Sequence, residues 1–179
     1  MEDRGVTVRA ARPADFDTVI AVVDDWWGRP AARDLTRLFL DHFFGTSLIA
    51  EHGGELAGFL IGFLSPSQPQ EAYIHFAAVA PAWRRTGLAR SLYEQFFDRA
   101  RQDGRGVVKA ITSPQNGPSI AFHRAMGFAA SDPIEDYDGP SLDRVVFVRE
   151  ISLQGRPGQS LAAGGRRPAT SDQRPATAD

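Results

Sequence analysis

The chain has 179 residues, of which 42% are hydrophobic and 23% are charged, and it contains no cysteine. This length and composition suit one domain with a substantial core, and they exclude collagen-like and wholly disordered chains. The lack of cysteine excludes disulfides, thiol nucleophiles and thiolate metal sites. The net charge of −2 supplies no overall field for nucleic acid, so any anion site must be local.

The distribution of residue types gives no sign of a membrane segment, a signal peptide or a metal site. The amino-terminal residues lack the apolar core of a signal peptide, and no run approaches about 18 uninterrupted apolar residues. We therefore expect a cytoplasmic protein that has no membrane or nucleic-acid partner. No metal site is expected, because no ligand spacing relates the four histidines, which are His42, His52, His75 and His123.

The first third of the chain predicts a strand, two helices and a strand hairpin. Residues 6 to 11 alternate as a short strand does, and a proline and an aspartate then open a helix that ends at Gly28. Pro30 begins a second helix, whose apolar stripe is Leu35, Leu38, Phe39 and Phe43. Residues 46 to 51 and 55 to 64 flank a sequence typical of a hairpin turn, His52-Gly53-Gly54.

A strand, a basic turn and a helix follow one another in residues 73 to 97. Residues 73 to 79 are apolar or aromatic except for His75, which predicts a strand covered on both faces. Apolar residues recur at helical spacing from Leu88 onward, so the helix begins close to Gly87. A helix start carries unpaired N–H groups and partial positive charge, and a glycine there lets a phosphate approach. The turn predicts a pyrophosphate site made of Arg84, Arg85, Thr86, Gly87, Leu88 and Ala89.

The part of the chain after the central helix predicts one buried strand and one short helix. The central helix ends near Gly104, and residues 107 to 111 form a buried strand. Asn116 opens a loop and a helix cap, and the short helix after it stops at Gly127. Strand and helix therefore alternate once more behind the basic turn.

The last part of the chain predicts a loop, a strand and a tail. The acidic loop of residues 131 to 141 leads to the last strand, residues 142 to 151. Residues 153 to 179 are rich in Gly, Ala and Pro and lack aromatic residues, so we expect a disordered tail. The folded domain is expected to be residues 1 to 152.

Two motifs occur in this order of elements. Residues 84 to 89 match the pattern Gln or Arg, two residues, Gly, one residue, then Gly or Ala. Asn116 lies seven residues before His123, inside an ending that runs from Phe122 to Gly127-Phe128. With the order of elements, these motifs resemble the GNAT superfamily of acetyl-CoA-dependent N-acetyltransferases, over roughly residues 5 to 151.

The resemblance implies a fold and a reaction. The fold is an α/β (α+β) domain whose mixed, mostly antiparallel central sheet of about six to seven strands is flanked by about four helices. The sheet is splayed at its central strands, so that the pantetheine arm of acetyl-CoA enters the gap. The reaction transfers acetyl directly to a primary amine of a small molecule or peptide. Because members often pair through sheet edges or helices, a homodimer is also an expectation.

The resemblance also assigns cofactor-binding residues. The backbone of Ala77, Ala78 and Val79 would bind the pantetheine arm and the acetyl carbonyl. The amides from Arg85 to Arg90 would hold the pyrophosphate, as the helix start independently predicts. Asn116 would orient the arm or the loop beside it, and a capping role for its side chain stays open.

The resemblance identifies the catalytic groups less clearly than the cofactor-binding residues. His123 stands where many members have a tyrosine that protonates the departing thiolate, and a partner-bonded histidine is the alternative. Ile111 stands where some members have a glutamate base. His75 is a candidate base because a polar residue in a buried strand needs a reason, although a satisfied core histidine is the alternative. Other candidate bases are Glu71, Glu135, Asp136 and Asp138.

The acceptor side has aromatic and acidic candidates. Asp24 and Asp25 precede two tryptophans, and the acidic loop contains Asp136-Tyr137-Asp138. If they line the cleft, a cationic amine is favoured, and a helix end and a solvated loop are the alternatives. The candidate acceptor residues are Trp26, Trp27, Tyr73 and Asp136.

The alternatives to acetyl transfer are a nucleotide-binding enzyme, a CoA-binding module and a tail that binds nucleic acid. A nucleotide-binding enzyme is disfavoured because the chain lacks both the P-loop and the Gly-x-Gly-x-x-Gly patterns. A module that binds acyl-CoA without turnover stays open, because the usual acid is replaced and one base position is apolar. Nucleic-acid binding by the tail would be salt-sensitive and would require residues 153 to 179.

Overall fold

The first half of the chain forms three strands and two α-helices in the computed structural model, which describes residues 5–152. β1 (Val6–Ala10) leads into α1 (Asp15–Trp27), and α2 (Arg37–His42) lies between two short 3-10 turns, η1 (Ala32–Asp34) and η2 (Phe44–Thr46). The predicted hairpin is confirmed as β2 (Leu48–His52) and β3 (Glu55–Leu64).

The second helix is shorter than predicted. Leu35 leaves helical geometry with ψ of 89°, and Thr36 is extended with ψ of 152°, so η1 and α2 are separate. Leu35 is 1% exposed whereas Leu38 is 54% exposed, so the two side chains do not share a buried face. The prediction of one helix from Pro30 was wrong because burial of Leu35 bends the chain before the helix can continue.

The second half contains four strands and two α-helices. The elements are β4 (Glu71–Val79), the 3-10 turn η3 (Pro81–Trp83), α3 (Leu88–Gln102), β5 (Val107–Thr112), α4 (Gly117–Ala125), β6 (Ala129–Ala130) and β7 (Val145–Glu150). The final strand begins at Val145 rather than at residue 142, because residues before it belong to a hairpin bridged by Ile134 and Arg144. The predicted tail, residues 153–179, lies outside the described residues.

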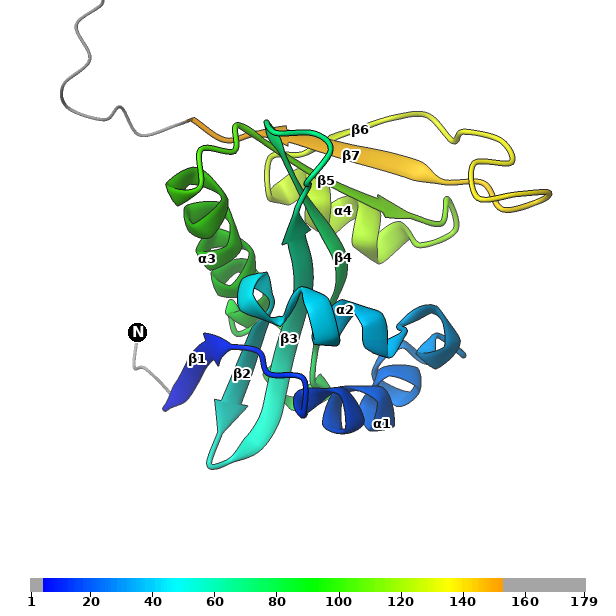
Figure 1. Cartoon of the computed structure of the whole chain (residues 1–179). Coiled ribbons are helices and arrows are strands. Elements are labelled where there is room, and N and C mark those ends of the chain that lie inside the picture. Colours follow the sequence, from blue (N-terminus) through cyan, green and yellow to red (C-terminus); the bar gives the residue numbers. More distant parts are fainter. Residues whose placement is uncertain (1–4, 153–179) are drawn as a thin grey trace, which may run out of the picture.

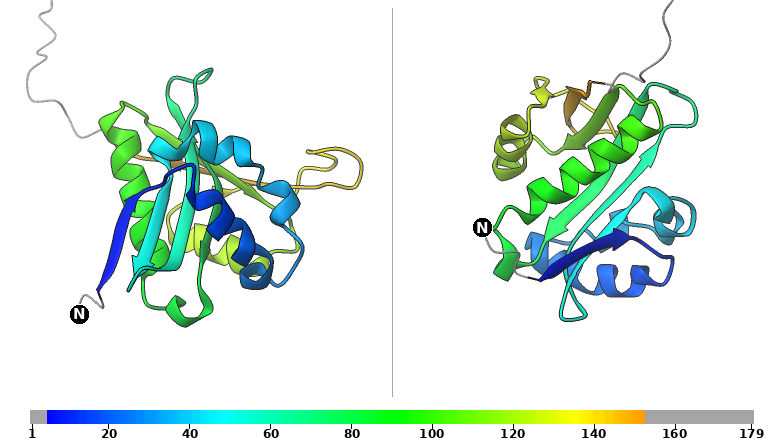
Figure 2. Two further views of the ribbon diagram at one scale, coloured as in Figure 1. Left: turned by 60° about the horizontal axis from the view of Figure 1, so that its bottom comes forward. Right: turned by 90° about the vertical axis from the view of Figure 1, so that its left-hand side faces the viewer.

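The seven strands form one sheet in the order β1-β2-β3-β4-β5-β7-β6 (Figure 1). Only β4 and β5 are parallel neighbours. The helices cover its two faces: α1 and α2 pack in one apolar cluster, and α3 and α4 pack in the other (Figure 2). The predicted mixed, mostly antiparallel sheet with four helices is confirmed.

β4 and β5 separate after a short paired segment. They pair only at Glu71↔Val107, Ala72↔Val108 and Tyr73↔Lys109, although β4 continues to Val79. Beyond Tyr73, the edge of β4 that faces β5 therefore has no strand partner within the described residues. The predicted splay at the central strands is confirmed.

A β-bulge interrupts β4 at His75. Ile61 pairs with Phe76 and Gly62 pairs with Ile74, so His75 has no partner residue on β3. Strict alternation would place Ile74 and Phe76 on one face, but Ile74 packs with α3 and Phe76 packs with α1. Residues of β4 pack in the apolar clusters on both faces of the sheet, as predicted for a strand covered on both faces, although alternate residues from Glu71 to Val79 are only half-buried.

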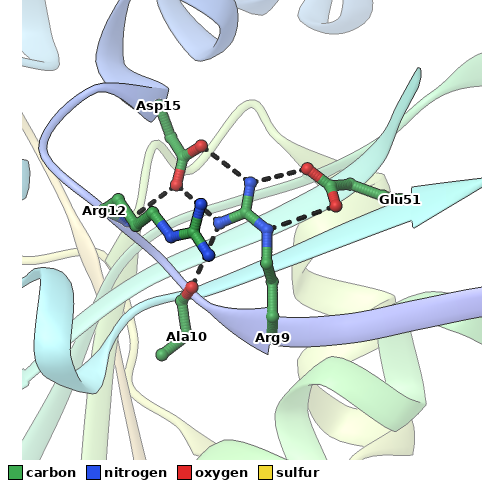
Figure 3. Close-up of polar contacts among 5 residues, drawn as sticks. All are labelled: Arg9, Ala10, Arg12, Asp15 and Glu51. Carbon is green, nitrogen blue, oxygen red and sulfur yellow. Dashed lines mark hydrogen bonds and ion pairs between the residues drawn. The ribbon is translucent and has the colours of Figure 1, made fainter. Parts of the chain in front are cut away.

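A charged cluster fixes the start of α1 against the sheet (Figure 3). Arg9 makes bidentate contacts with Asp15 at 2.8 Å for both pairs of atoms, and with Glu51 at 2.6 and 3.2 Å. The Arg12 N–H also donates to the Asp15 carboxylate at 2.6 Å. The Arg9 guanidinium holds the pKa of Asp15 below its ordinary value. This contact orients α1, whose opposite end carries Trp26 and Trp27.

Candidate active site

A cavity of about 360 Å³ opens where β4, the basic turn and the start of α3 meet. It contains most of the predicted cofactor-binding residues and two aromatic residues that were not predicted to bind the cofactor, Trp83 and Phe122. Its lining is Val79, Trp83, Arg84, Arg85, Gly87, Leu88, Ala89, Arg90 and Phe122. A second hollow, of about 250 Å³, lies between β1 and α3 and contains none of the predicted site residues.

The start of α3 has the geometry of an anion site. Gly87 is the N-cap with φ of 94°, and the first intrahelical donor is Ser91, whose N–H bonds the Gly87 carbonyl at 3.0 Å. The N–H groups of Leu88, Ala89 and Arg90 precede that donor and have no intrahelical acceptor. Helix dipole and free donors together favour a bound anion at this turn.

The turn before α3 is held in a strained conformation. Arg85 has φ of 63°, a region that residues other than glycine rarely occupy. The Thr86 hydroxyl donates to the Trp83 carbonyl at 2.7 Å and closes the turn. This conformation directs the start of α3 toward the cavity.

Arg84 connects the turn to α1. Its guanidinium donates to the Trp26 carbonyl at 2.5 Å, at a helix end that has no basic residue of its own in the last turn. The first arginine of the motif therefore contacts α1 as well as lining the cavity. No sequence signal predicts this contact, because it joins residues from separate elements.

The three β4 residues predicted to bind the acetyl arm lie at the splay. Ala78 and Val79 pair with Phe59 and Gly58 on β3, which leaves the opposite edge of β4 facing the gap. Ala77 and Val79 pack with α3, whereas Ala78 packs with α1. An unpaired strand edge presents N–H and C=O groups that an extended arm carrying amides can bond.

Asn116 caps α4. Its side-chain oxygen accepts a hydrogen bond from the Ser119 N–H at 3.2 Å. This is the capping role that the sequence left open. A contact with the pantetheine arm remains a prediction.

His123 lies in the core rather than in the lining of the cavity. It is 6% exposed and stacks on Phe147 at 4.0 Å with an interplanar angle of 4°. Nδ1 lies 2.8 Å from the Ser119 carbonyl oxygen, which can only accept, so Nδ1 carries hydrogen. In the neutral ring Nε2 then accepts from the Tyr93 hydroxyl at 3.1 Å. Both ring nitrogens of His123 therefore have partners. This geometry favours a structural role for His123 over the predicted role as the acid.

Acid should destabilise the protein through its buried imidazoles. Burial lowers the pKa of both His123 and His75 from 6.5, so the unfolded chain binds more protons below that pH. Stability should be full above about pH 6.5 and fall by at most about 1.4 kcal/mol per pH unit for each histidine. Denaturant unfolding between pH 7.5 and 5 measures this slope, above the pH range in which carboxylates titrate.

A His123→Gln variant isolates one imidazole. Glutamine can still bond Tyr93 and Ser119 but does not titrate, so the slope should become shallower. His42→Gln is the matched control, because His42 is exposed. Equal slopes for wild type and His123→Gln would contradict a neutral, partner-bonded His123.

His75 has an unpartnered ring nitrogen. Its ring stacks on Phe39 with centroids 3.8 Å apart, and its Nε2 is buried without a hydrogen-bond partner among residues 5–152. Burial lowers the pKa of His75, and a hydrogen bond with the Asp34 backbone offsets only part of this effect. His75 therefore keeps a free lone pair, unlike a fully satisfied core histidine.

The other candidate bases have partners or face solvent. Glu71 pairs with the Lys109 ammonium at 2.5 Å, and Asp138 pairs with Arg144 at 2.7 Å. The Asp136 carboxylate accepts from the Ser141 N–H at 2.7 Å inside its own loop, and Glu135 is exposed. His75 differs from these carboxylates in that its unpartnered acceptor atom, Nε2, is buried.

The tryptophans of α1 pack on the sheet. Trp26 stacks on Phe59 at 6.0 Å, and Trp27 contacts Phe76 at 4.9 Å. The Asp24 carboxylate accepts from the Ala31 and Ala32 N–H groups at 2.7 Å, and these bonds lower its pKa. Asp24 therefore stabilises the connection after α1. This is the helix-end role that the sequence left open as the alternative to binding the acceptor.

Tyr73 is half-buried on β4. Its ring stacks on Phe63 at 5.4 Å, and burial together with the charges of Tyr137 and Asp138 raises its pKa. The Asp136 carboxylate, in contrast, is occupied in the loop turn.

Within residues 5–152, no group of three or more His, Asp or Glu side chains is arranged to hold a metal ion. The same part of the chain contains no helix with the length and apolar character needed to span a membrane.

Comparison with known proteins gives consistent matches. L-2,4-diaminobutyric acid acetyltransferase of Nocardia farcinica is 34% identical over 89 residues, which are 50% of this chain and 46% of that protein. Mycothiol acetyltransferase of Sanguibacter keddieii is 31% identical over 137 residues, 69% of this chain and 44% of that protein. The chain thus spans about half the length of the curated relatives it matches.

Solved structures share the fold. Ard1 from Thermoplasma volcanium superposes with a TM-score of 0.69 at 20% identity, over 83% of this chain and 99% of that one. Diaminobutyrate acetyltransferase from Paenibacillus lautus superposes with a TM-score of 0.66 at 23% identity, over 86% of this chain and 98% of that one. Residues 16–128, well over half of the chain, match the family model described as the acetyltransferase (GNAT) family. The chain therefore belongs to the acetyltransferase (GNAT) family.

Proposed function

We propose that the protein transfers the acetyl group of acetyl-CoA to a primary amine of a small molecule or peptide. The observation that carries this function is the cavity that joins the free N–H groups of α3 to the unpaired edge of β4. The first site suits a pyrophosphate and the second suits the amides of an extended arm. Relatives named as acetyltransferases of diaminobutyrate and mycothiol support the same reading.

The chemistry is direct transfer between two substrates held in one cleft. The N–H groups of Leu88 to Arg90 hold the pyrophosphate, and the backbone of Ala77 to Val79 aligns the thioester. The amine nitrogen attacks the thioester carbonyl, a backbone N–H near Val79 stabilises the oxyanion, and the CoA thiolate leaves. The described residues offer no cysteine nucleophile, so we expect no acetylated enzyme intermediate.

His75 is proposed as the proton acceptor for the amine. It lies on β4 two residues before Ala77, and its Nε2 lone pair has no partner among the described residues. Because burial lowers the pKa of His75 from 6.5, the ring is in its basic form at neutral pH.

Replacing His75 should slow the reaction and remove one ionisation. His75→Gln is expected to lower kcat by about 10²- to 10⁴-fold, the range for loss of a general base. In the wild type the acidic limb of kcat/KM should lie below pH 6.5, because the folded-state pKa of His75 is lowered. His42→Gln is the control. If His75→Gln leaves the rate or the acidic limb unchanged, a group other than His75 accepts the amine proton.

The first acceptors to test are small diamino compounds. 2,4-Diaminobutyrate is the leading candidate, because several relatives are named for it. Release of free CoA thiol over a panel of amines tests the function: we expect amine-dependent release. Binding of acetyl-CoA without release for any amine would instead support a CoA-binding module. A homodimer and a cytoplasmic location stay proposals, to be tested by sedimentation and by localisation.

A further inference from the structure

Arg84 lies between the cavity and the end of α1. Its side chain lines the cavity, and its Nη2 donates to the Trp26 carbonyl oxygen at 2.5 Å. Trp26 is the last residue but one of α1, so its carbonyl is among those that receive no hydrogen bond from within the helix. The last turn of α1 contains no basic residue. Arg84 therefore brings positive charge to the negative end of the α1 dipole from another element.

The guanidinium of Arg84 keeps donors for a second partner. The bond with Trp26 uses one of its several N–H groups, and Arg84 makes no other side-chain hydrogen bond within residues 5–152. The side chain is exposed and shares the lining of the cavity with Gly87 and Leu88, where the pyrophosphate is proposed to bind. One guanidinium can therefore bond a phosphate oxygen and the Trp26 carbonyl at the same time.

The end of α1 packs against the surroundings of His75. Trp26 stacks on Phe59 of β3 with ring centroids 6.0 Å apart. Trp27 contacts Phe76 of β4 at 4.9 Å, and the Phe76 ring in turn lies 4.2 Å from the ring of His75. A displacement of this helix end would therefore reach the proposed base through direct packing.

A bound anion should strengthen the contact between Arg84 and α1. The hydrogen bond with the Trp26 carbonyl is exposed to water, so by itself it contributes little to the position of the helix end. A pyrophosphate beside Arg84 would fix the guanidinium and displace water from it, and both effects strengthen its bond with the carbonyl.

We propose that Arg84 is a positioning residue that bridges the bound pyrophosphate and the end of α1, so that acetyl-CoA holds Trp26 and Trp27 against the sheet. The packing of Trp27 on Phe76 then keeps His75 in place for the reaction. The inference rests on the proposed function and adds to it a contact by which the cofactor positions the base.

The tryptophans of α1 report this contact directly. The chain has three tryptophans, and Trp83→Phe removes the one that lines the cavity. In this background acetyl-CoA should lower the quenching of Trp26 and Trp27 fluorescence by acrylamide, because both side chains are half-buried and become more firmly held. Adding Arg84→Gln should abolish this protection at acetyl-CoA concentrations that saturate the variant.

Arg85→Gln is the matched control. Arg85 lines the same cavity and is also exposed, but within the described part of the chain its side chain makes no hydrogen bond with α1. Each substitution removes one positive charge, so each should raise the Kd for acetyl-CoA by about 10-fold. Only Arg84→Gln should remove the protection and lower kcat with both substrates saturating, by about 5-fold or more. Because both side chains are exposed, denaturant unfolding should be nearly unchanged in both variants.

The outcomes separate the bridge from the reaction. Loss of the protection in Arg85→Gln as well as in Arg84→Gln would assign it to charge alone and overturn the bridge. Binding of acetyl-CoA to the Trp83→Phe protein without any change in quenching would also overturn the bridge, but it would leave acetyl transfer standing. If titration calorimetry detects no binding of acetyl-CoA to the wild type, the bridge and the proposed function both fail.

Discussion

Replacing Gly87 with valine should weaken acetyl-CoA binding by at least about 100-fold. Gly87 has φ of 94°, which a β-branched residue adopts only under strain, and a Cβ there would meet no protein atom within 4 Å among the described residues. The new side chain would therefore enter the open space at the start of α3, where the pyrophosphate is proposed to bind. Isothermal titration with acetyl-CoA measures the change.

Gly104 supplies a matched control for this variant. It follows the other end of α3 with φ of 79°, and a Cβ there also meets nothing within 4 Å. Gly104→Val should carry a similar backbone cost, of order 1 to 3 kcal/mol, while acetyl-CoA affinity stays unchanged. If folded Gly87→Val binds acetyl-CoA as tightly as Gly104→Val, the pyrophosphate does not bind at this turn.

Replacing Gly62 with alanine should cause the largest loss of stability. A Cβ at Gly62 would lie 2.6 Å from a ring carbon of Phe96 and 2.9 Å from the Tyr73 carbonyl oxygen. Phe96 is fully buried and Tyr73 contributes backbone, so neither atom can move without shifting α3 or β4. We expect a loss of about 3 kcal/mol or more in the free energy of unfolding, measured by denaturant titration.

Two comparisons check the cause of that loss. Gly45→Ala adds the same methyl group where nothing lies within 4 Å, and it should leave stability nearly unchanged. Phe96→Leu should recover part of the loss when combined with Gly62→Ala, because the two changes act on one contact. Additive effects in the double variant would rule out the contact with Phe96. Gly62 also lies opposite the bulge at His75, so close packing of α3 on β3 and the local shape of β4 are coupled.

The sequence predicted best those features that depend on neighbouring residues. The turn before α3 was predicted from local chemistry, because a glycine, two arginines and the following helical periodicity are adjacent in the chain. The hairpin around Gly53 and Gly54 was predicted for the same reason, and both glycines have positive φ. The break between η1 and α2 was missed, because burial of Leu35 depends on tertiary packing.

The bulge at His75 was also beyond sequence reasoning. Residues on both sides of it are apolar, so the pattern contained no sign that the face of the strand changes. Only the pairing of Gly62 with Ile74 and of Ile61 with Phe76 shows it. His75 is thus the extra residue of a bulge, a position that the sequence pattern did not indicate.

Long-range contacts within the candidate site could not be predicted. Arg84 reaches Trp26 from another element, and Phe122 lines the cavity although the resemblance implied a role for its neighbour, His123. The partners of His123, Tyr93 among them, come from packing of α4 on α3 and explain its burial. The spacing of Asn116, Phe122 and His123 identified the second motif, but packing determines which of these side chains lines the cavity.

The most direct test of the proposed reaction is the stoichiometry of its two products. Incubation with acetyl-CoA and an accepted amine should yield one N-acetylated amine, identified by mass, for each CoA thiol released. The protein itself should remain unacetylated throughout the reaction. Thiol release without acetylated amine, or transfer that proceeds only through an acetylated residue of the protein, would contradict direct acetyl transfer in this cleft.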